Sequence, residues 1–183
     1  MKKLILSIYL FITILSAGEI QKIPLSMKTF SIKNFDIEYT RGTYLIILAK
    51  DQLMDRLTNP DNFPPYGDNF VEFKQTQGFN VEVMSLDVEG LTTAEQIKDK
   101  IQQDYGSSLE YILLVGDVSG SYVVPTFYVP SINETGDLDV TDYPYTYNDS
   151  EGILFPYCFI GRWSIQSPGD LGNIKIRTIE YSK

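Results

Sequence analysis

Apolar residues gather in four short runs, each about the length of a β-strand. The runs are Tyr44–Ala49, Val81–Leu86, Tyr111–Val115 and Tyr157–Ile160. The first and third are continuously apolar, which is typical of strands covered on both faces. We expect a strand at each run, with the last one leading directly into Gly161-Arg162.

Helical signals lie between and after these runs. Phe70, Val71 and Phe73 predict a helix that begins near Asp68 or Asn69 and stops at Gly78. In the next helix, Thr92 and Glu95 predict a capping box at the first turn, and Gly106 predicts its end. The apolar residues of that helix recur at helical spacing: Ala94, Ile97, Ile101 and Tyr105.

A final helix is predicted after the fourth strand. Ser167 is a suitable cap and Pro168 suits the first helical position. The intervening segment 118–155 is rich in Pro and Gly, and we expect it to be loop.

The resulting order of strands and helices predicts an α/β fold, a three-layer sandwich with a mainly parallel sheet. In such sheets, ligands bind beyond the carboxyl ends of the strands. Residues expected at that edge are Lys50, Asp87, Gly116-Asp117 and Gly161-Arg162.

Composition limits the chemistry. The chain has 183 residues with a net charge of −9, so its surface repels nucleic acid and anionic lipid, and neither is an expected partner. It contains no histidine, which excludes a Ser-His-Asp triad, a Cys-His dyad or a histidine zinc site built from this chain alone. The single cysteine excludes an internal disulfide.

Three segments are predicted along the chain. Residues 1–18 read as a secretory signal peptide, with two lysines, a short apolar stretch and small residues at the cleavage point. An N-terminal membrane anchor is the alternative, and after cleavage we expect no membrane contact. Residues 19–42 read as a leader or propeptide-like linker. Residues 43–183 form the main domain, and we expect a secreted or cell-surface protein.

Three motifs resemble the gingipain family of cysteine peptidases. They are Tyr111–Asp117, then Thr141-Asp142-Tyr143 with Tyr145, then Phe159–Arg162. The resemblance covers about Tyr44 to Lys183. It implies a caspase-like fold of two subdomains, of which this chain is the N-terminal one, truncated before the catalytic half. The nucleophilic cysteine and the His-Gly base motif would lie in the missing C-terminal catalytic subdomain.

The resemblance also implies a structural calcium ion. Its ligands would be Asp117 together with Asp149, Glu151 or both, and backbone carbonyls near Tyr147. Calcium takes hard oxygen ligands of this kind from irregular loops. The alternative is that these carboxylates only solvate a loop. Glycoside hydrolysis by two of the loop acids is compatible with the composition, but no spacing supports it.

Two other side chains are candidates for a role. Arg162 is expected to pair with Asp117 or Asp142 and hold loops in place, with substrate binding as the alternative. Cys158 lies between two aromatic residues, and we expect an inert buried thiol.

The main hypothesis is therefore the scaffold half of an exported cysteine endopeptidase that acts on protein or peptide substrates. This chain alone is predicted to be inactive, because the catalytic dyad is missing. The alternative is a secreted, non-catalytic binding or adhesion module on the same fold.

Overall fold

The structure, a computed structural model, describes residues 41–58, 69–131, 136–148 and 155–182. All of them belong to one compact unit, Glu38–Lys183. The predicted signal peptide and almost all of the predicted leader lie outside the described residues. Within the described ranges, no helix is both long and apolar enough to cross a bilayer.

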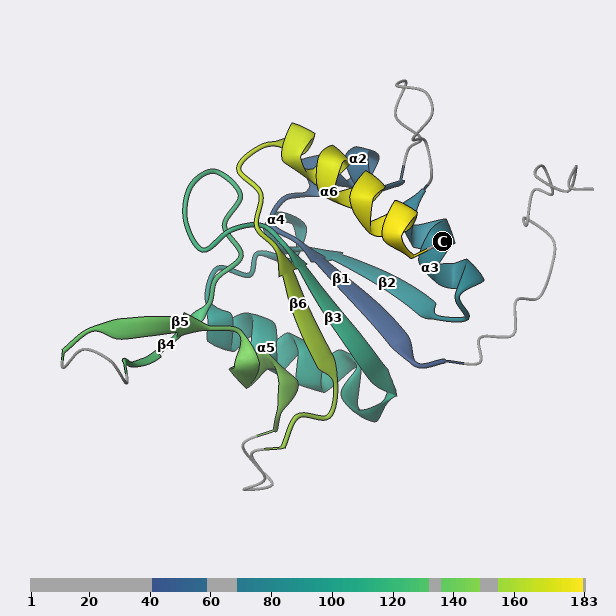
Figure 1. Cartoon of the computed structure of the whole chain (residues 1–183). Coiled ribbons are helices and arrows are strands. Elements are labelled where there is room, and N and C mark those ends of the chain that lie inside the picture. Colours follow the sequence, from purple (N-terminus) through teal and green to yellow (C-terminus); the bar gives the residue numbers. More distant parts are fainter. Residues whose placement is uncertain (1–40, 59–68, 132–135, 149–154, 183) are drawn as a thin grey trace, which may run out of the picture. The chain divides into compact units, whose positions relative to one another are not determined.

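A four-stranded parallel sheet forms the centre of this unit (Figure 1). Its strand order is β2-β1-β3-β6, and every neighbouring pair is parallel. The strands are β1 (Thr43–Leu48), β2 (Asn80–Ser85), β3 (Leu109–Val115) and β6 (Phe159–Trp163). The prediction of a mainly parallel sheet is confirmed.

Helices cover both faces of the sheet. Helix α5 (Ala94–Asp104) lies on one face, and α2 (Met54–Thr58), α3 (Phe70–Thr76) and α6 (Pro168–Tyr181) pack together on the other (Figure 1). The predicted three layers are thus present. Three short helical turns follow strands: η2 (Asp51–Leu53), α4 (Leu86–Glu89) and η4 (Tyr143–Thr146). A fourth, η3 (Gly106–Ser108), joins α5 to β3.

The core runs along the two central strands. Every residue from Leu45 to Leu48 is fully buried, as are Leu114 and Val115 at the end of β3. Such complete burial needs cover on both faces, and α5 on one side with α3 and α6 on the other provides it. This explains why the first and third runs are continuously apolar.

The capping box of α5 differs from the predicted one by one residue. Thr93, not Thr92, is the cap, and its hydroxyl accepts from the amide of Gln96. The Gln96 side chain accepts in return from the Thr93 amide, at 3.2 Å. The sequence Thr-Thr-Ala-Glu-Gln allows either register by spacing alone. The observed one begins the helix at Ala94 and buries Ala94, Ile97 and Ile101.

Two further predictions need correction. The last strand is Phe159–Trp163, so it begins two residues later than predicted and includes Gly161 and Arg162. The segment 118–155 is not loop throughout, because β4 (Phe127–Pro130) and β5 (Leu138–Thr141) pair as an antiparallel hairpin. Both strands have only four residues, and β4 ends in proline, so the strand signal was weak.

Candidate functional site

Residues 122–124 cross close to the carboxyl end of β3. The Asp117 amide donates to the Tyr122 carbonyl at 2.7 Å, and the Val124 amide donates to the Asp117 carbonyl at 2.9 Å. Gly116 lies beneath this crossing. A Cβ at that position would lie 2.7 Å from the Tyr122 carbonyl oxygen, closer than real Cβ atoms approach. Glycine is therefore required for the two segments to meet.

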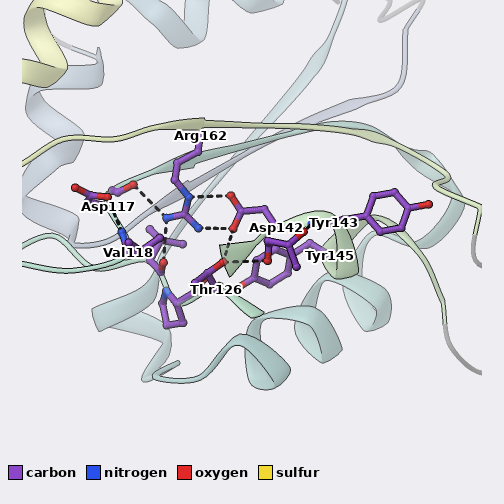
Figure 2. A network of polar contacts seen from close by, with 11 residues as sticks. Asp117, Val118, Thr126, Asp142, Tyr143, Tyr145 and Arg162 are labelled. Atoms are coloured by element: carbon purple, nitrogen blue, oxygen red, sulfur yellow. Dashed lines mark hydrogen bonds and ion pairs between the residues drawn. The ribbon is translucent and has the colours of Figure 1, made fainter. Parts of the chain in front are cut away.

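Arg162 connects this crossing to the loop before η4 (Figure 2). Its Nε donates to Asp142 Oδ2 at 2.8 Å and its Nη2 donates to Asp142 Oδ1 at 2.6 Å. We call this two-pronged ion pair the Asp142–Arg162 fork. Its Nη1 donates to the carbonyls of Gly116 and Val124 at 3.2 and 3.0 Å. The two side chains are only 11% and 21% exposed, so water screens this pair weakly.

Thr126 and Tyr145 complete the network (Figure 2). The Thr126 hydroxyl lies 3.1 Å from Asp142 Oδ1 and 2.9 Å from the Thr141 carbonyl. The Tyr145 hydroxyl donates to the Pro125 carbonyl at 2.7 Å. Tyr145 is fully buried, and this burial raises the pKa of its phenol well above its ordinary value. It therefore remains a neutral donor.

Asp117 belongs to a neighbouring set of contacts. Its Oδ1 accepts from the Val118 amide at 2.8 Å, and its Oδ2 accepts from Nε2 of Gln166 at 2.5 Å. No ion pair joins Asp117 to Arg162 in the part of the chain that is described. Of the two carboxylates predicted as partners of Arg162, the structure brings Asp142 to it.

The predicted calcium ligands lie only partly in the described structure. Asp149 and Glu151 fall outside the described residues, so Asp117 is the one predicted carboxylate ligand that can be placed. Among the described residues, no group of three or more carboxylate, thiol or imidazole side chains is close enough to hold a metal. The Tyr147 carbonyl accepts from Nε2 of Gln102. The calcium site stays a prediction.

Cys158 lies just before β6 and is almost completely buried. This burial raises the pKa of its thiol to about 12. At neutral pH the thiol is therefore protonated, whereas a nucleophilic cysteine must supply a thiolate. Cys158 is a core residue.

The geometry defines what the Asp142–Arg162 site does. A guanidinium has five N–H groups, and four of those of Arg162 donate to Asp142, Gly116 and Val124. Little capacity is left for an anionic substrate, so Arg162 holds three chain segments together. Sequence reasoning missed Thr126 and Gln166, and no local pattern marks either residue.

Comparison with known proteins places this architecture in a family. The family model described as peptidase family C25 matches residues 38–183, the whole of the compact unit. The chain belongs to peptidase family C25. The resemblance to gingipain-type cysteine peptidases that the sequence motifs predict is thereby confirmed.

Individual relatives agree with this family. Gingipain R2 of Porphyromonas gingivalis is 32% identical over 158 residues, covering 82% of this chain and 20% of the relative. Gingipain R1 of the same organism is 32% identical over 122 residues, covering 63% of this chain and 11% of the relative. This C25 chain therefore spans about a fifth or less of the length of these two relatives.

Solved structures give the same result. The crystal structure of the Arg-specific cysteine proteinase gingipain R matches with a TM-score of 0.54 and 26% identity. The match covers 80% of this chain and 29% of that one. A complex of the pro- and mature domains of Porphyromonas gingivalis RgpB matches with a TM-score of 0.55 and 27% identity, over 75% of this chain and 29% of that one.

Proposed function

We propose that this chain is the scaffold half of an exported cysteine endopeptidase and that the catalytic cysteine and histidine lie on sequence outside it. The observation that carries the proposal is chemical. A member of a cysteine peptidase family needs a thiolate and a base, and this chain has no histidine and one buried thiol of raised pKa.

The role proposed for this half is to hold one side of a larger catalytic assembly in place. Its parallel sheet supplies a rigid base, and the Asp142–Arg162 fork fixes the loops at the carboxyl edge of that sheet. In the whole enzyme, the second subdomain would supply the cysteine that attacks the scissile carbonyl. It would also supply the histidine that moves protons, and backbone amides would hold the oxyanion.

A direct test is hydrolysis by the purified chain. It should cleave no member of a fluorogenic peptide library between pH 6 and 9, and iodoacetamide should label Cys158 only after unfolding. The gene should also be read beyond codon 183. The proposal expects a reading frame that encodes a cysteine and a His-Gly pair. Specific turnover by the chain alone, or a stop codon directly after codon 183, contradicts it.

Export and calcium binding are further parts of the proposal. Export is supported by the charged, apolar and small-residue order of residues 1–18. Calcium is supported by the position of Asp117 at the end of β3 and by the acidic residues Asp149 and Glu151 in the same loop region of the sequence. The calcium would be structural: it would join the end of β3 to the segment before β6.

A further inference from the structure

A pocket of about 330 Å³ opens at the carboxyl ends of β1 and β2. Ala49 and Leu86, both buried, line it and follow these two strands directly. Leu91, Val123 and Pro125 are the other apolar side chains of its lining. The volume lies at the lower end of the roughly 300–1,000 Å³ typical of small-molecule sites. The lining is mainly apolar and includes two charged residues, Lys50 and Asp87.

The position of the pocket in the sheet favours a binding role. From β1 the chain passes to β2 on one side, and it then crosses to β3 on the other side of β1. Such a reversal of strand order opens a crevice at the carboxyl edge, and ligands of open α/β sheets bind there. Here the crevice is bounded by residues that follow β1, β2 and β3.

The wall from β3 is held rigidly. Val123 and Pro125 flank Val124, whose carbonyl accepts from Arg162 and whose amide donates to Asp117. The Pro125 carbonyl accepts from the buried Tyr145 hydroxyl. Because the backbone on both sides of the wall is fixed by hydrogen bonds, the pocket exists before a ligand arrives, which lowers the cost of binding.

Two charged groups line the pocket. In the part of the chain that is described, the Lys50 ammonium has no carboxylate partner, and it lies over the Tyr122 ring, 5.5 Å from the ring centroid. Asp87 is fixed by two amides, because its Oδ1 accepts from Asp51 and Val88 at 2.9 and 3.1 Å. Its Oδ2 has no hydrogen-bond donor among the described residues. The pocket therefore offers one ammonium donor, Lys50, and one oriented carboxylate acceptor, Asp87.

We propose that this pocket binds the carboxyl terminus of a peptide whose last side chain is aliphatic. Lys50 pairs with the terminal carboxylate, Asp87 Oδ2 accepts from a peptide N–H, and the apolar walls take the side chain. Short-chain fatty acids share the carboxylate and the aliphatic body. They have no N–H for Asp87, so the site favours the peptide.

The test is to titrate each of three probes into the full chain and to measure its binding by saturation-transfer NMR. N-acetyl-alanyl-leucine should bind, N-acetyl-alanyl-leucinamide should bind about tenfold more weakly, and hexanoate should bind more weakly than the acid peptide. The tenfold figure corresponds to the loss of one charge-assisted contact. Equal binding of the peptide acid and its amide, or no binding of either at millimolar concentration, overturns the proposal. Binding of hexanoate as tight as the acid peptide overturns the choice of a peptide.

Variants locate the binding. Lys50→Met should remove the preference for the acid over the amide, and Val123→Phe should fill the pocket and abolish binding of both. Lys100→Met is the matched control, because Lys100 lies on α5 and pairs with Glu89 and Asp104. It removes one lysine charge and should leave all three titrations unchanged. A response to Lys100→Met equal to that of Lys50→Met contradicts the site.

Discussion

The central strands and the β4–β5 hairpin are both rich in apolar residues, yet they differ completely in burial. In β1 the residues Leu45 to Leu48 are all 0% exposed. In the hairpin, one face carries two cross-strand pairs, Tyr128 with Val140 and Pro130 with Leu138, and all four residues are exposed. An apolar strand is buried only where a second layer covers it, and the described residues place no layer over this face.

The base of the hairpin explains how it is held without such a layer. Phe127 packs edge-to-face on Tyr145, with ring centroids 5.1 Å apart, and Thr126 bonds the carbonyl of Thr141. A two-stranded ribbon is marginally stable by itself. The hairpin therefore depends on the rest of the domain, to which its first residues are attached.

The largest difference is expected from truncating matched apolar side chains. Leu114→Ala in β3 empties space in a closed core and should lower the free energy of unfolding by about 3 kcal/mol. Val140→Ala in β5 removes a half-exposed side chain and should cost well under about 1 kcal/mol. Urea unfolding measures both values. Equal losses would mean that a layer absent from this structure covers the hairpin.

The fork should matter almost as much as the core. Arg162→Ala leaves the Asp142 carboxylate without its partner and frees the carbonyls of Gly116 and Val124, so we expect a loss of about 2–3 kcal/mol. Arg41→Ala is the control. It removes an exposed ion pair with Glu110, which should contribute about 1 kcal/mol or less. If both variants unfold at the same urea concentration, the fork is not a structural element.

Alkaline pH should lower the free energy of unfolding, because the domain buries a thiol and a phenol. The pKa of Cys158 is raised by burial from 9.0 to about 12, so the folded state keeps its proton more tightly than the unfolded state does. The stability linked to this group is complete below pH 9 and is lost as the pH rises toward 12. Between pH 8 and 10.5 the loss should be about 1–2 kcal/mol for this thiol.

Cys158→Ala separates the thiol from the other buried acids. Burial also raises the pKa of Tyr44 to about 12, so part of the alkaline loss should persist in the variant. Urea unfolding at several pH values should show a shallower decline for Cys158→Ala than for the parent chain. An unchanged slope would show that the thiol has ordinary acidity in the folded state.

The smallest expected effect is that of calcium. If calcium binds at the end of β3, a concentration of ten times the dissociation constant should stabilise the fold by about 1.4 kcal/mol, which is seen as a rise in Tm. Asp117→Asn should abolish this rise. Asp139→Asn makes the same change on the exposed hairpin and should preserve it. No rise in the parent chain, or an equal loss in both variants, contradicts the calcium proposal.

Sequence predicts the sheet well because its signals are local and strong. Continuous apolar runs fix β1 and β3, and Ser167 with Pro168 fixes the start of α6, where the Ser167 hydroxyl accepts from the Asp170 amide. The α5 cap was misplaced by one residue because two adjacent threonines offer the same spacing. The observed box pairs Thr93 with Gln96, and the local spacing does not choose it over Thr92 with Glu95.

The site was predictable only in part. The Gly-Asp and Gly-Arg motifs identify Gly116, Asp117 and Arg162 as residues at one edge. The choice of Asp142 over Asp117 depends on a crossing by residues 122–124 and on the hairpin that leads to Asp142, and neither has a local sequence signal. The pocket at Lys50 depends in the same way on Val123, which follows a different strand.

The hydrogen bonds of Arg162 to distant carbonyls have a consequence for biosynthesis. Arg162 follows Gly116 by 46 residues and Val124 by 38. At about 5–20 residues per second, the ribosome needs about 2–9 s to add those 46 residues. During that interval β3 has been synthesised but β6 has not, so the carbonyls of Gly116 and Val124 still lack the guanidinium that joins them.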